Sequence, residues 1–339
     1  MILTVNINEM KNIIFKASCL LGAFCLLFSC DKEIESINLQ PQLEYSQDYF
    51  DNLKAYKEGF KDRSICFVWF SDYQQNTSLG FRFAGLPDSI DICSLWGGIP
   101  DEKDNPLAYK EMWEMRNNKG TKLVIPTIIR IMENENYANF GLSYEDMVNQ
   151  KTTIDASGVY PDWCVLYGDY LLKQMNDNKL DGLDLDYEPE SGDERSYGIY
   201  GERLTLFVKY LGQFIGPKSS NPEKMLIVDF YGSIPSSETE PYVDYFVQQY
   251  YGCTLSEYSF NSDFPNEKQV FTENIGDNWQ TGGNLEQQAG FQPSSGYKGG
   301  FGAFFCQRDY YTTESGADKE IPYGHLRKGI QLQNPAVIK

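Results

Sequence analysis

Eight short apolar runs with strand character constrain the fold of this chain more than any other feature. Amphipathic stretches with helical spacing separate several of them, as at 109–117, 163–175 and 202–214. Strands that alternate with helices are typical of a parallel sheet, and eight such units predict an α/β fold, a single-domain (β/α)8 TIM barrel. The runs are 65–70, 90–96, 123–130, 180–188, 225–231, 242–251, 270–274 and 300–306.

The fourth run contains a row of carboxylates in the sequence DGLDLDYE, at 181–188. Side chains alternate between the two faces of a strand, so Asp184, Asp186 and Glu188 share one face. Crowded carboxylates repel, and one of them then keeps its proton to a higher pH than in water. Such a carboxyl can act as a general acid. A calcium-binding loop would need glycine after its third oxygen ligand, whereas here Leu, Leu and Tyr alternate with the acids.

DGLDLDYE resembles, position for position, the DGxDxDxE signature of glycoside hydrolase family 18, which includes chitinases and endo-β-N-acetylglucosaminidases. The resemblance implies that Glu188 is the general acid and base, that Asp186 orients the substrate's 2-acetamido group, and that Asp184 supports Asp186. It also implies a mechanism in which this acetamido group attacks in place of a protein nucleophile. Such a mechanism requires no metal and no organic cofactor.

The sixth run, within YVDYFVQQYYG at 242–252, resembles the sixth strand of family 18 endo-β-N-acetylglucosaminidases. In that strand an amide and, two residues later, a tyrosine face the active centre. Alternation allows Gln248 with Tyr250, or Gln249 with Tyr251. We select Gln248 and Tyr250, because the family's tyrosine is followed by another residue before glycine. Tyr250 would then bind the acetamide carbonyl oxygen, and Gln248 would help to seat the same sugar.

Other strand ends supply weaker candidates for sugar binding, because barrel enzymes carry their chemistry at the C-terminal ends of strands and aromatic rings pack on the apolar faces of sugars. The eighth run, GAFFCQRDY, lacks the tryptophan that chitinases usually place beneath the sugar. The segment between the last two runs is also too short for the insertion that deepens chitinase grooves. The weaker candidates are Trp69, Tyr73, Trp96, Asp229, Tyr231, Gln249 and Tyr251.

The N-terminus has the features of an export signal. Lys11 and Lys16 precede an apolar run at 17–28, and Leu27-Phe28-Ser29-Cys30 resembles a bacterial lipobox. We therefore expect a lipoprotein signal peptide at 1–29, a flexible tether from a lipidated Cys30 at 30–45, and a catalytic barrel at 46–339. An ordinary cleaved leader, which would release a free secreted protein, is the alternative, and Met10 competes with Met1 as the true start.

Charge and composition limit the possible partners. The net charge of −19 at pH 7 repels nucleic acid and anionic lipid headgroups, and it suits a neutral ligand. With one histidine and no C-x-x-C spacing among eight cysteines, the sequence predicts neither a metal site nor a disulfide scaffold.

Together these features predict an endo-β-N-acetylglucosaminidase that cleaves the chitobiose core of protein-linked N-glycans. We expect a monomer, anchored through lipid at Cys30 to the outer membrane of a Gram-negative bacterium and exposed on its surface. Two alternatives remain: a chitinase that acts on GlcNAc polymers, and a glycan-binding lipoprotein that keeps the barrel without catalysis. The presence of Glu188 disfavours the second, because the acid is generally lost in such proteins.

Overall fold

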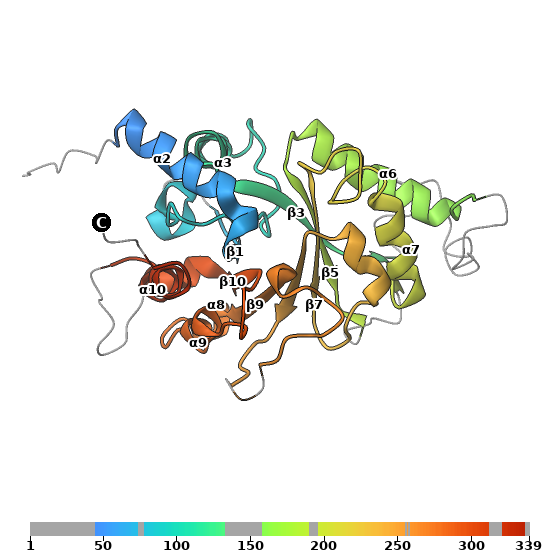
Figure 1. The fold of residues 1–339 in the computed structure, drawn as a ribbon. Coiled ribbons are helices and arrows are strands. Elements are labelled where there is room, and N and C mark those ends of the chain that lie inside the picture. Colours follow the sequence, from blue (N-terminus) through green and yellow to red (C-terminus); the bar gives the residue numbers. More distant parts are fainter. Residues whose placement is uncertain are drawn as a thin grey trace, which may run out of the picture. The chain divides into compact units, whose positions relative to one another are not determined.

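Eight parallel strands close into a barrel (Figure 1), so the predicted (β/α)8 architecture is confirmed. Each predicted apolar run supplies one strand, and neighbours in sequence are neighbours around the barrel, with the last strand paired to the first. The strands are β1 (Ile65–Trp69), β2 (Ile92–Ser94), β3 (Lys122–Ile128), β5 (Gly182–Tyr187), β7 (Met225–Phe230), β8 (Tyr245–Gln249), β9 (Gln269–Asn274) and β10 (Gly300–Phe304).

The computed structural model describes residues 45–73, 78–132, 158–189, 196–254, 256, 258–311 and 321–335. The predicted leader, Cys30 and the tether as far as residue 44 lie outside these ranges. All elements named below belong to one unit, Ser46–Lys339. Among the described residues, no helix is both long and apolar enough to cross a membrane.

Helices cover the outside of the barrel, and three of them match the predicted amphipathic stretches. The connections after β1, β7 and β8 contain short 3-10 turns, at Leu79–Phe81 and Phe83–Gly85, Ser237–Tyr242, and Asn266–Lys268. Two more such turns are Gly59–Asp62 and Cys306–Tyr311. The α-helices are α2 (Gln47–Glu58), α3 (Pro106–Lys119), α6 (Asp162–Asp177), α7 (Glu202–Leu211), α8 (Ile275–Asn278), α9 (Leu285–Gly290) and α10 (Gly324–Gln333).

The ends of α3 show how local sequence defines a helix. The Asn105 side chain accepts a hydrogen bond from the backbone N–H of Ala108, and Pro106, with its fixed φ, takes the first helical position. Gly120 ends the helix with φ of 73°, a left-handed conformation that favours glycine.

A short antiparallel ribbon lies outside the barrel sheet. It consists of β4 (Arg130–Met132) and β6 (Ser196–Gly198). The sequence predicts that the third strand continues to Arg130, which is wrong: β3 ends at Ile128, and Arg130 begins the ribbon instead. The change of sheet occurs at Ile129, whose backbone N–H donates to Asp186 O while its carbonyl accepts from the N–H of Ile199.

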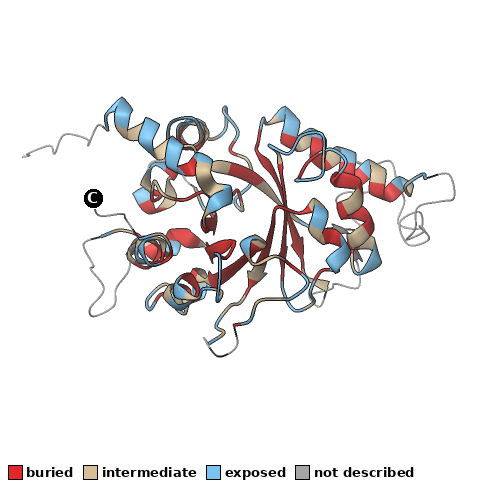
Figure 2. Ribbon diagram, in the orientation of Figure 1, coloured by how far each residue is buried: buried red, intermediate tan, exposed pale blue. Residues whose placement is uncertain are grey.

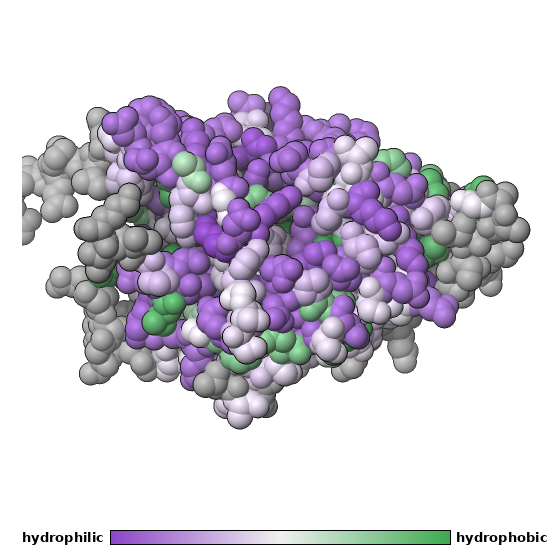
Figure 3. Space-filling view, viewed as in Figure 1, coloured by the Kyte–Doolittle hydropathy of each residue, from purple (hydrophilic) through white to green (hydrophobic). Residues whose placement is uncertain are grey.

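The strands are buried on both faces except in the second half of β3, whereas the helices are buried only toward the strands (Figure 2). The face seen in Figure 3 is mostly hydrophilic, with scattered apolar residues. One apolar cluster fills the barrel interior, and a second lies between strands and helices. The interior cluster consists of Ile65, Phe67, Trp69, Ile92, Val124, Met225, Ile227, Tyr245, Val247 and Val270.

Buried aspartates join alternate pairs of barrel strands at their N-terminal ends. Asp91, Asp181 and Asp244 each stand just before a strand. They accept backbone hydrogen bonds from Cys66, Leu123 and Leu226, each on the preceding strand, at 2.9 to 3.0 Å. Asp181 therefore braces the start of its strand.

Gly182 lets β5 approach its neighbour closely. A Cβ atom there would lie 2.3 Å from the carbonyl oxygen of Met225, the residue paired with Gly182 on β7. The glycine of DGLDLDYE therefore serves strand packing.

Candidate active site

A pocket of about 150 Å³ opens at the C-terminal ends of the strands. Carboxylates from two neighbouring strands face into it together with aromatic rings from β1, β8 and β10 and the loop after β2. Its lining residues are Trp69, Trp96, Ile128, Asp186, Glu188, Asp229, Gln249, Tyr251 and Phe304. Glu188 follows the last residue of β5 and is partly exposed, so it lies at the rim of the acidic strand.

Asp184 lies beneath the pocket and is fully buried. Its Oδ2 accepts hydrogen bonds from Trp69 Nε1 at 2.9 Å and from Ser94 Oγ at 2.7 Å. The carboxyl also contacts that of Asp229, and burial raises the pKa of both groups. For Asp229 the nearby charges of Asp186 and Asp184 raise the pKa further. Asp229 is thus the partner that holds a proton more strongly.

The contact between these two carboxyls explains two buried oxygens. Among the described residues, Asp184 Oδ1 and Asp229 Oδ2 have no donor as partner. A proton on Asp229 that is donated to Asp184 would satisfy both oxygens. The pair is best treated as one titrating unit.

Gln249 connects Asp229 to Asp186. Its Nε2 donates to Asp229 Oδ1 at 2.7 Å and, with longer geometry, to Asp186 Oδ1 at 3.4 Å. Asp186 is 3% exposed and is directly paired with Asp229 across β5 and β7. One amide therefore orients the Asp186 carboxylate while the substrate side of the pocket stays open.

Tyr251 brings a hydroxyl to the same carboxylates. Burial raises its pKa well above the ordinary value, and the charges of Asp229, Asp186, Glu188 and Asp184 raise it further. The phenol therefore stays protonated and can donate a hydrogen bond to a ligand.

Aromatic rings form one wall of the pocket, with Phe304 at its centre. Phe304 contacts Trp69 and Trp96 edge to face, at centroid distances of 6.0 and 5.3 Å. It stacks against Tyr251 at 6.0 Å. Such a surface suits the apolar face of a sugar ring.

The structure reverses the predicted phase of the sixth strand. Gln249 and Tyr251 face the pocket, so the selection of Gln248 and Tyr250 was wrong. Tyr250 lies on the opposite face, where its ring packs against Tyr258 and Phe271 at 5.5 and 5.3 Å. Gln248 is paired with Phe271 and shares that outer face.

The other predicted residues divide into two groups. Trp69, Trp96 and Asp229 line the pocket as the sequence suggests. Tyr73 does not: its ring packs on Phe83 at 4.7 Å, and its hydroxyl donates to a loop carbonyl. Tyr231 is 51% exposed just after β7 and is not part of the pocket lining.

Sequence reasoning missed three residues of this site. Phe304 shares a face with Gly300 and Gly302 on the eighth strand, so alternation could have identified it. Ser94 precedes Trp96 by two residues and points inward to Asp184. Ile128 ends β3 beside Asp186, its register partner on β5. Nothing in the sequence around this apolar residue indicates that it lines a site.

A parallel barrel with acidic and aromatic side chains at the C-terminal ends of its strands is typical of glycoside hydrolases, and the family match shows that the chain is one. Residues 30–277 match the model of glycoside hydrolase family 18, BT1044-like. The chain belongs to this family. A comparison with curated proteins gives no match.

Solved structures share the fold at low sequence identity. A selenomethionine form of BT1044 with one glutamate replaced by glutamine has a TM-score of 0.62 and 20% identity, covering 85% of this chain and 93% of that one. The apo endo-β-N-acetylglucosaminidase from Cordyceps militaris has a TM-score of 0.59 and 22% identity, covering 86% and 98%. A doubly substituted form of the same enzyme, in complex with fucosyl-N-acetylglucosamine-Asn, has a TM-score of 0.58 and 21% identity, with the same coverage.

Proposed function

We propose that this glycoside hydrolase is an endo-β-N-acetylglucosaminidase that cleaves the GlcNAc-β1,4-GlcNAc core of N-glycans with retention of configuration. The observation that carries the proposal is the convergence of Glu188, Asp186, Gln249 and Tyr251 in one pocket with an aromatic wall. Family membership adds support, as does the fold shared with the Cordyceps militaris enzyme, whose bound ligand contains N-acetylglucosamine linked to Asn.

Glu188 would protonate the leaving oxygen and later activate water. It stands at the end of β5, where a side chain can reach a glycosidic bond above the barrel. Asp186 would accept the acetamide N–H and stabilise the positive oxazolinium ion that forms when the acetamide oxygen attacks the anomeric carbon.

Tyr251 would donate its hydroxyl to the acetamide carbonyl oxygen, and Gln249 would hold Asp186 in the required orientation. Asp229 favours its protonated form, so it is poorly suited to act as a nucleophile in place of the acetamide. These features support substrate assistance, in which the protein supplies no nucleophile.

A glycan-release assay tests the activity. The protein is incubated with glycoproteins that carry high-mannose, hybrid or complex N-glycans and, in parallel, with soluble chitin oligomers. Release of glycans that lack the innermost GlcNAc supports the proposal, and the three glycoproteins then define the preferred type. Cleavage of chitin oligomers alone would identify a chitinase, and no cleavage of either class would favour a glycan-binding lipoprotein.

Two ligands test the nucleophile. A GlcNAc-thiazoline mimics the oxazolinium ion and should inhibit competitively, as expected of a mimic of a species that the site binds tightly. A substrate with a 2-hydroxyl group at the cleaved sugar should not be hydrolysed. Efficient hydrolysis of that analogue would instead assign a protein carboxylate, with Asp186 the first candidate.

We also propose that the protein is a lipoprotein anchored at Cys30 to the outer membrane and exposed on the surface of a Gram-negative bacterium. The lipobox-like segment 27–30 supports this, and the family match begins at residue 30, where the mature chain would start.

A further inference from the structure

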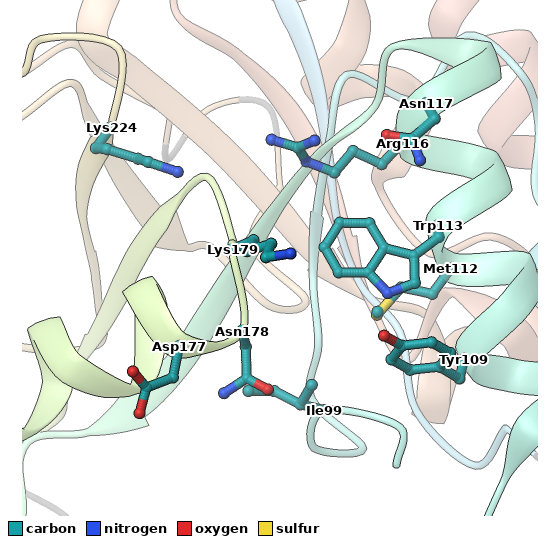
Figure 4. A pocket seen from close by; sticks show the side chains of 10 residues that line it. All are labelled: Ile99, Tyr109, Met112, Trp113, Arg116, Asn117, Asp177, Asn178, Lys179 and Lys224. Carbon is teal, nitrogen blue, oxygen red and sulfur yellow. The ribbon is translucent and has the colours of Figure 1, made fainter. Parts of the chain in front are cut away.

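A second pocket, of about 600 Å³, lies on the side of the barrel between α3 and the C-terminal end of α6 (Figure 4). It shares no lining residue with the active-site pocket. Lys179 and Lys224 stand just before β5 and β7, so this part of the pocket lies at the opposite end of the strands from Glu188. Its volume falls within the range of roughly 300 to 1,000 Å³ that is typical of small-molecule sites.

Three cationic side chains point into this pocket. Figure 4 shows the guanidinium of Arg116 and the ammonium groups of Lys179 and Lys224 directed toward the same space. Arg116 Nε and Nη2 donate to Asp181 at 2.8 and 2.7 Å, so one of the three charges is already balanced. Lys224 Nζ donates to the carbonyl of Leu180.

The remaining positive charge is not balanced by the groups around it. Lys179 is exposed, and its side chain has no hydrogen bond or ion pair to any other part of the chain that the structure describes. Asp177, at the rim, is paired with Lys173. The pKa of Lys224 is lowered, chiefly by burial, and Arg116 and Lys122 add to this while Asp181 opposes it.

An aromatic wall lies beside these cations. Tyr109 and Trp113 are one helical turn apart on α3, with ring centroids 6.2 Å apart and planes at 75°, and both are partly exposed. The Arg116 guanidinium carbon lies 5.6 Å from the centroid of the Trp113 ring. Asn117 and Asn178 contribute amides to the lining.

We propose that this pocket binds an acidic saccharide, a sugar unit that carries a carboxylate or a sulfate group. The anionic group would pair with Lys179, Lys224 and the outer edge of Arg116, because guanidinium and ammonium groups form their strongest hydrogen bonds with such anions. The apolar face of the sugar would pack on Trp113. On a chain of net charge −19, which repels anions in general, a cationic pocket marks the place where an acidic ligand is accepted.

The role goes beyond the proposed hydrolysis and does not depend on it. The structural role of Arg116, which braces Asp181 at the start of β5, accounts for one cation only. It does not explain why Lys179 and Lys224 converge with Arg116 beside exposed aromatic rings.

Binding of three matched saccharides tests the proposal: 3′-sialyllactose, lactose 3′-sulfate and lactose. Dissociation constants are measured at low salt by titration calorimetry or ligand-detected NMR. We expect at least one acidic saccharide to bind about tenfold or more tightly than lactose, and high salt to weaken that binding. Lys179→Gln should weaken it about 3- to 10-fold, as expected for loss of one charged contact.

The control variant is Lys110→Gln, which removes the same charge from a 70% exposed position on α3, outside the pocket. It should leave binding unchanged. Trp113→Ala should abolish binding of the acidic saccharide. Because this variant removes a partly buried ring, it can damage the fold, and in that case the result for Lys179→Gln decides whether the proposal stands.

Binding of only one acidic saccharide would identify carboxylate or sulfate as the recognised group. Equal binding of both would show that the pocket recognises the negative charge and does not distinguish the two groups. Each of these results supports the site. Lactose that binds as tightly as the acidic pair, no binding of either acidic saccharide, or an equal loss in Lys110→Gln and Lys179→Gln would overturn it.

Discussion

Asp229 sets the charge balance of the active site. It lies beside Asp184 and Asp186, and three ionised carboxylates so close together in a buried place would repel strongly. A proton held between Asp184 and Asp229 removes one of these charges, so that Asp186 can stay ionised. Gln249 then holds Asp186 in place, because its amide donates hydrogen bonds to both Asp186 and Asp229.

Glu188→Gln should lower turnover of a glycoprotein substrate by at least 100-fold while glycan binding and thermal stability stay close to those of the parent. The amide has the shape of the carboxyl but cannot deliver a proton, and general acid–base catalysis contributes about 10²- to 10⁴-fold. Rates are measured by glycan release, and binding by calorimetry. A variant that retains more than a few per cent of the activity would remove Glu188 from the role of acid.

Tyr251→Phe and Tyr250→Phe form a matched pair that tests which tyrosine serves the site. Tyr251 lines the pocket, and if its hydroxyl binds the acetamide in the transition state, as proposed, its loss should lower kcat about 10- to 100-fold. Tyr250 packs on the outer face, and its variant should keep kcat within about twofold. The reverse ranking would restore the phase that the sequence suggested.

The phase of the sixth strand could not be fixed from its own residues. A parallel barrel strand is buried on both faces, so Phe246 and Val247 are equally apolar although they point in opposite directions. The neighbouring strand β7 shows which residues of β8 face inward. Val247 pairs with Asp229, whose polar side chain marks the inner face of the barrel. By contrast, on the fourth strand charge and apolar residues alternate strictly, and the sequence alone places Asp184, Asp186 and Glu188.

Three barrel strands begin with the same interaction, made by Asp91, Asp181 and Asp244. Each accepts a backbone N–H of the preceding strand, and the first two are also paired with Arg63 and Arg116. Among the described residues no arginine pairs with Asp244, and burial raises its pKa to about 6, against the hydrogen bond from the Leu226 N–H and the charges of Lys61 and Lys268. Of these three aspartates, Asp244 therefore changes its protonation state near pH 6.

Stability should depend on pH through Asp244. Its pKa is about 6 in the folded protein and about 3.9 in an unfolded chain, so between these values the folded state binds more protons. The stabilisation that comes from this extra proton binding is fully present below about pH 4 and is lost as the pH rises through 6. The free energy of unfolding then falls by up to about 3 kcal/mol. Asp244→Asn, which cannot titrate, should therefore gain stability relative to the parent over this range.

Urea unfolding of the parent and of Asp244→Asn at pH 4, 5, 6 and 7 measures this difference. Asp88→Asn serves as the control, because Lys119 and Tyr49 hold the pKa of Asp88 below its usual value, so its linked change in stability falls mainly below pH 4 and its difference from the parent should stay nearly constant from pH 5 to 7. A difference between Asp244→Asn and the parent that stays constant with pH would contradict the shift at Asp244.

Eight strands and three helices were predictable because apolar runs of strand length and helical spacing are local signals. The β4–β6 ribbon was not, since its two strands are three residues each and lie more than sixty positions apart. The 3-10 turns after β7 and β8 were also not predicted, since each is only three to six residues long; Pro241 lies inside the first, and Pro265 is the N-cap of the second.

Charge is distributed unevenly over the chain. The carboxylates of Asp186, Glu188 and Asp229 surround the pocket at the C-terminal ends of the strands, while Arg116, Lys179 and Lys224 gather near the N-terminal ends. A neutral sugar can enter the acidic pocket without an electrostatic penalty, whereas an acidic sugar is attracted to the other end of the barrel.

A lipid anchor would place all of this chemistry at a membrane surface. Cys30 would carry the lipid, and if residues 31 to about 45 form the tether that the sequence predicts, its reach would be ~5 to 6 Å × √n for n residues. Cys30→Ala should abolish metabolic labelling with palmitate and move the protein from the membrane fraction to the soluble fraction. Activity on soluble glycoproteins should not change, because Cys30 precedes the barrel unit, Ser46–Lys339, in the sequence. If the parent carries no lipid, or if Cys30→Ala stays with the membrane, the anchor is wrong while the assignment of the active site stands, since the two rest on different residues.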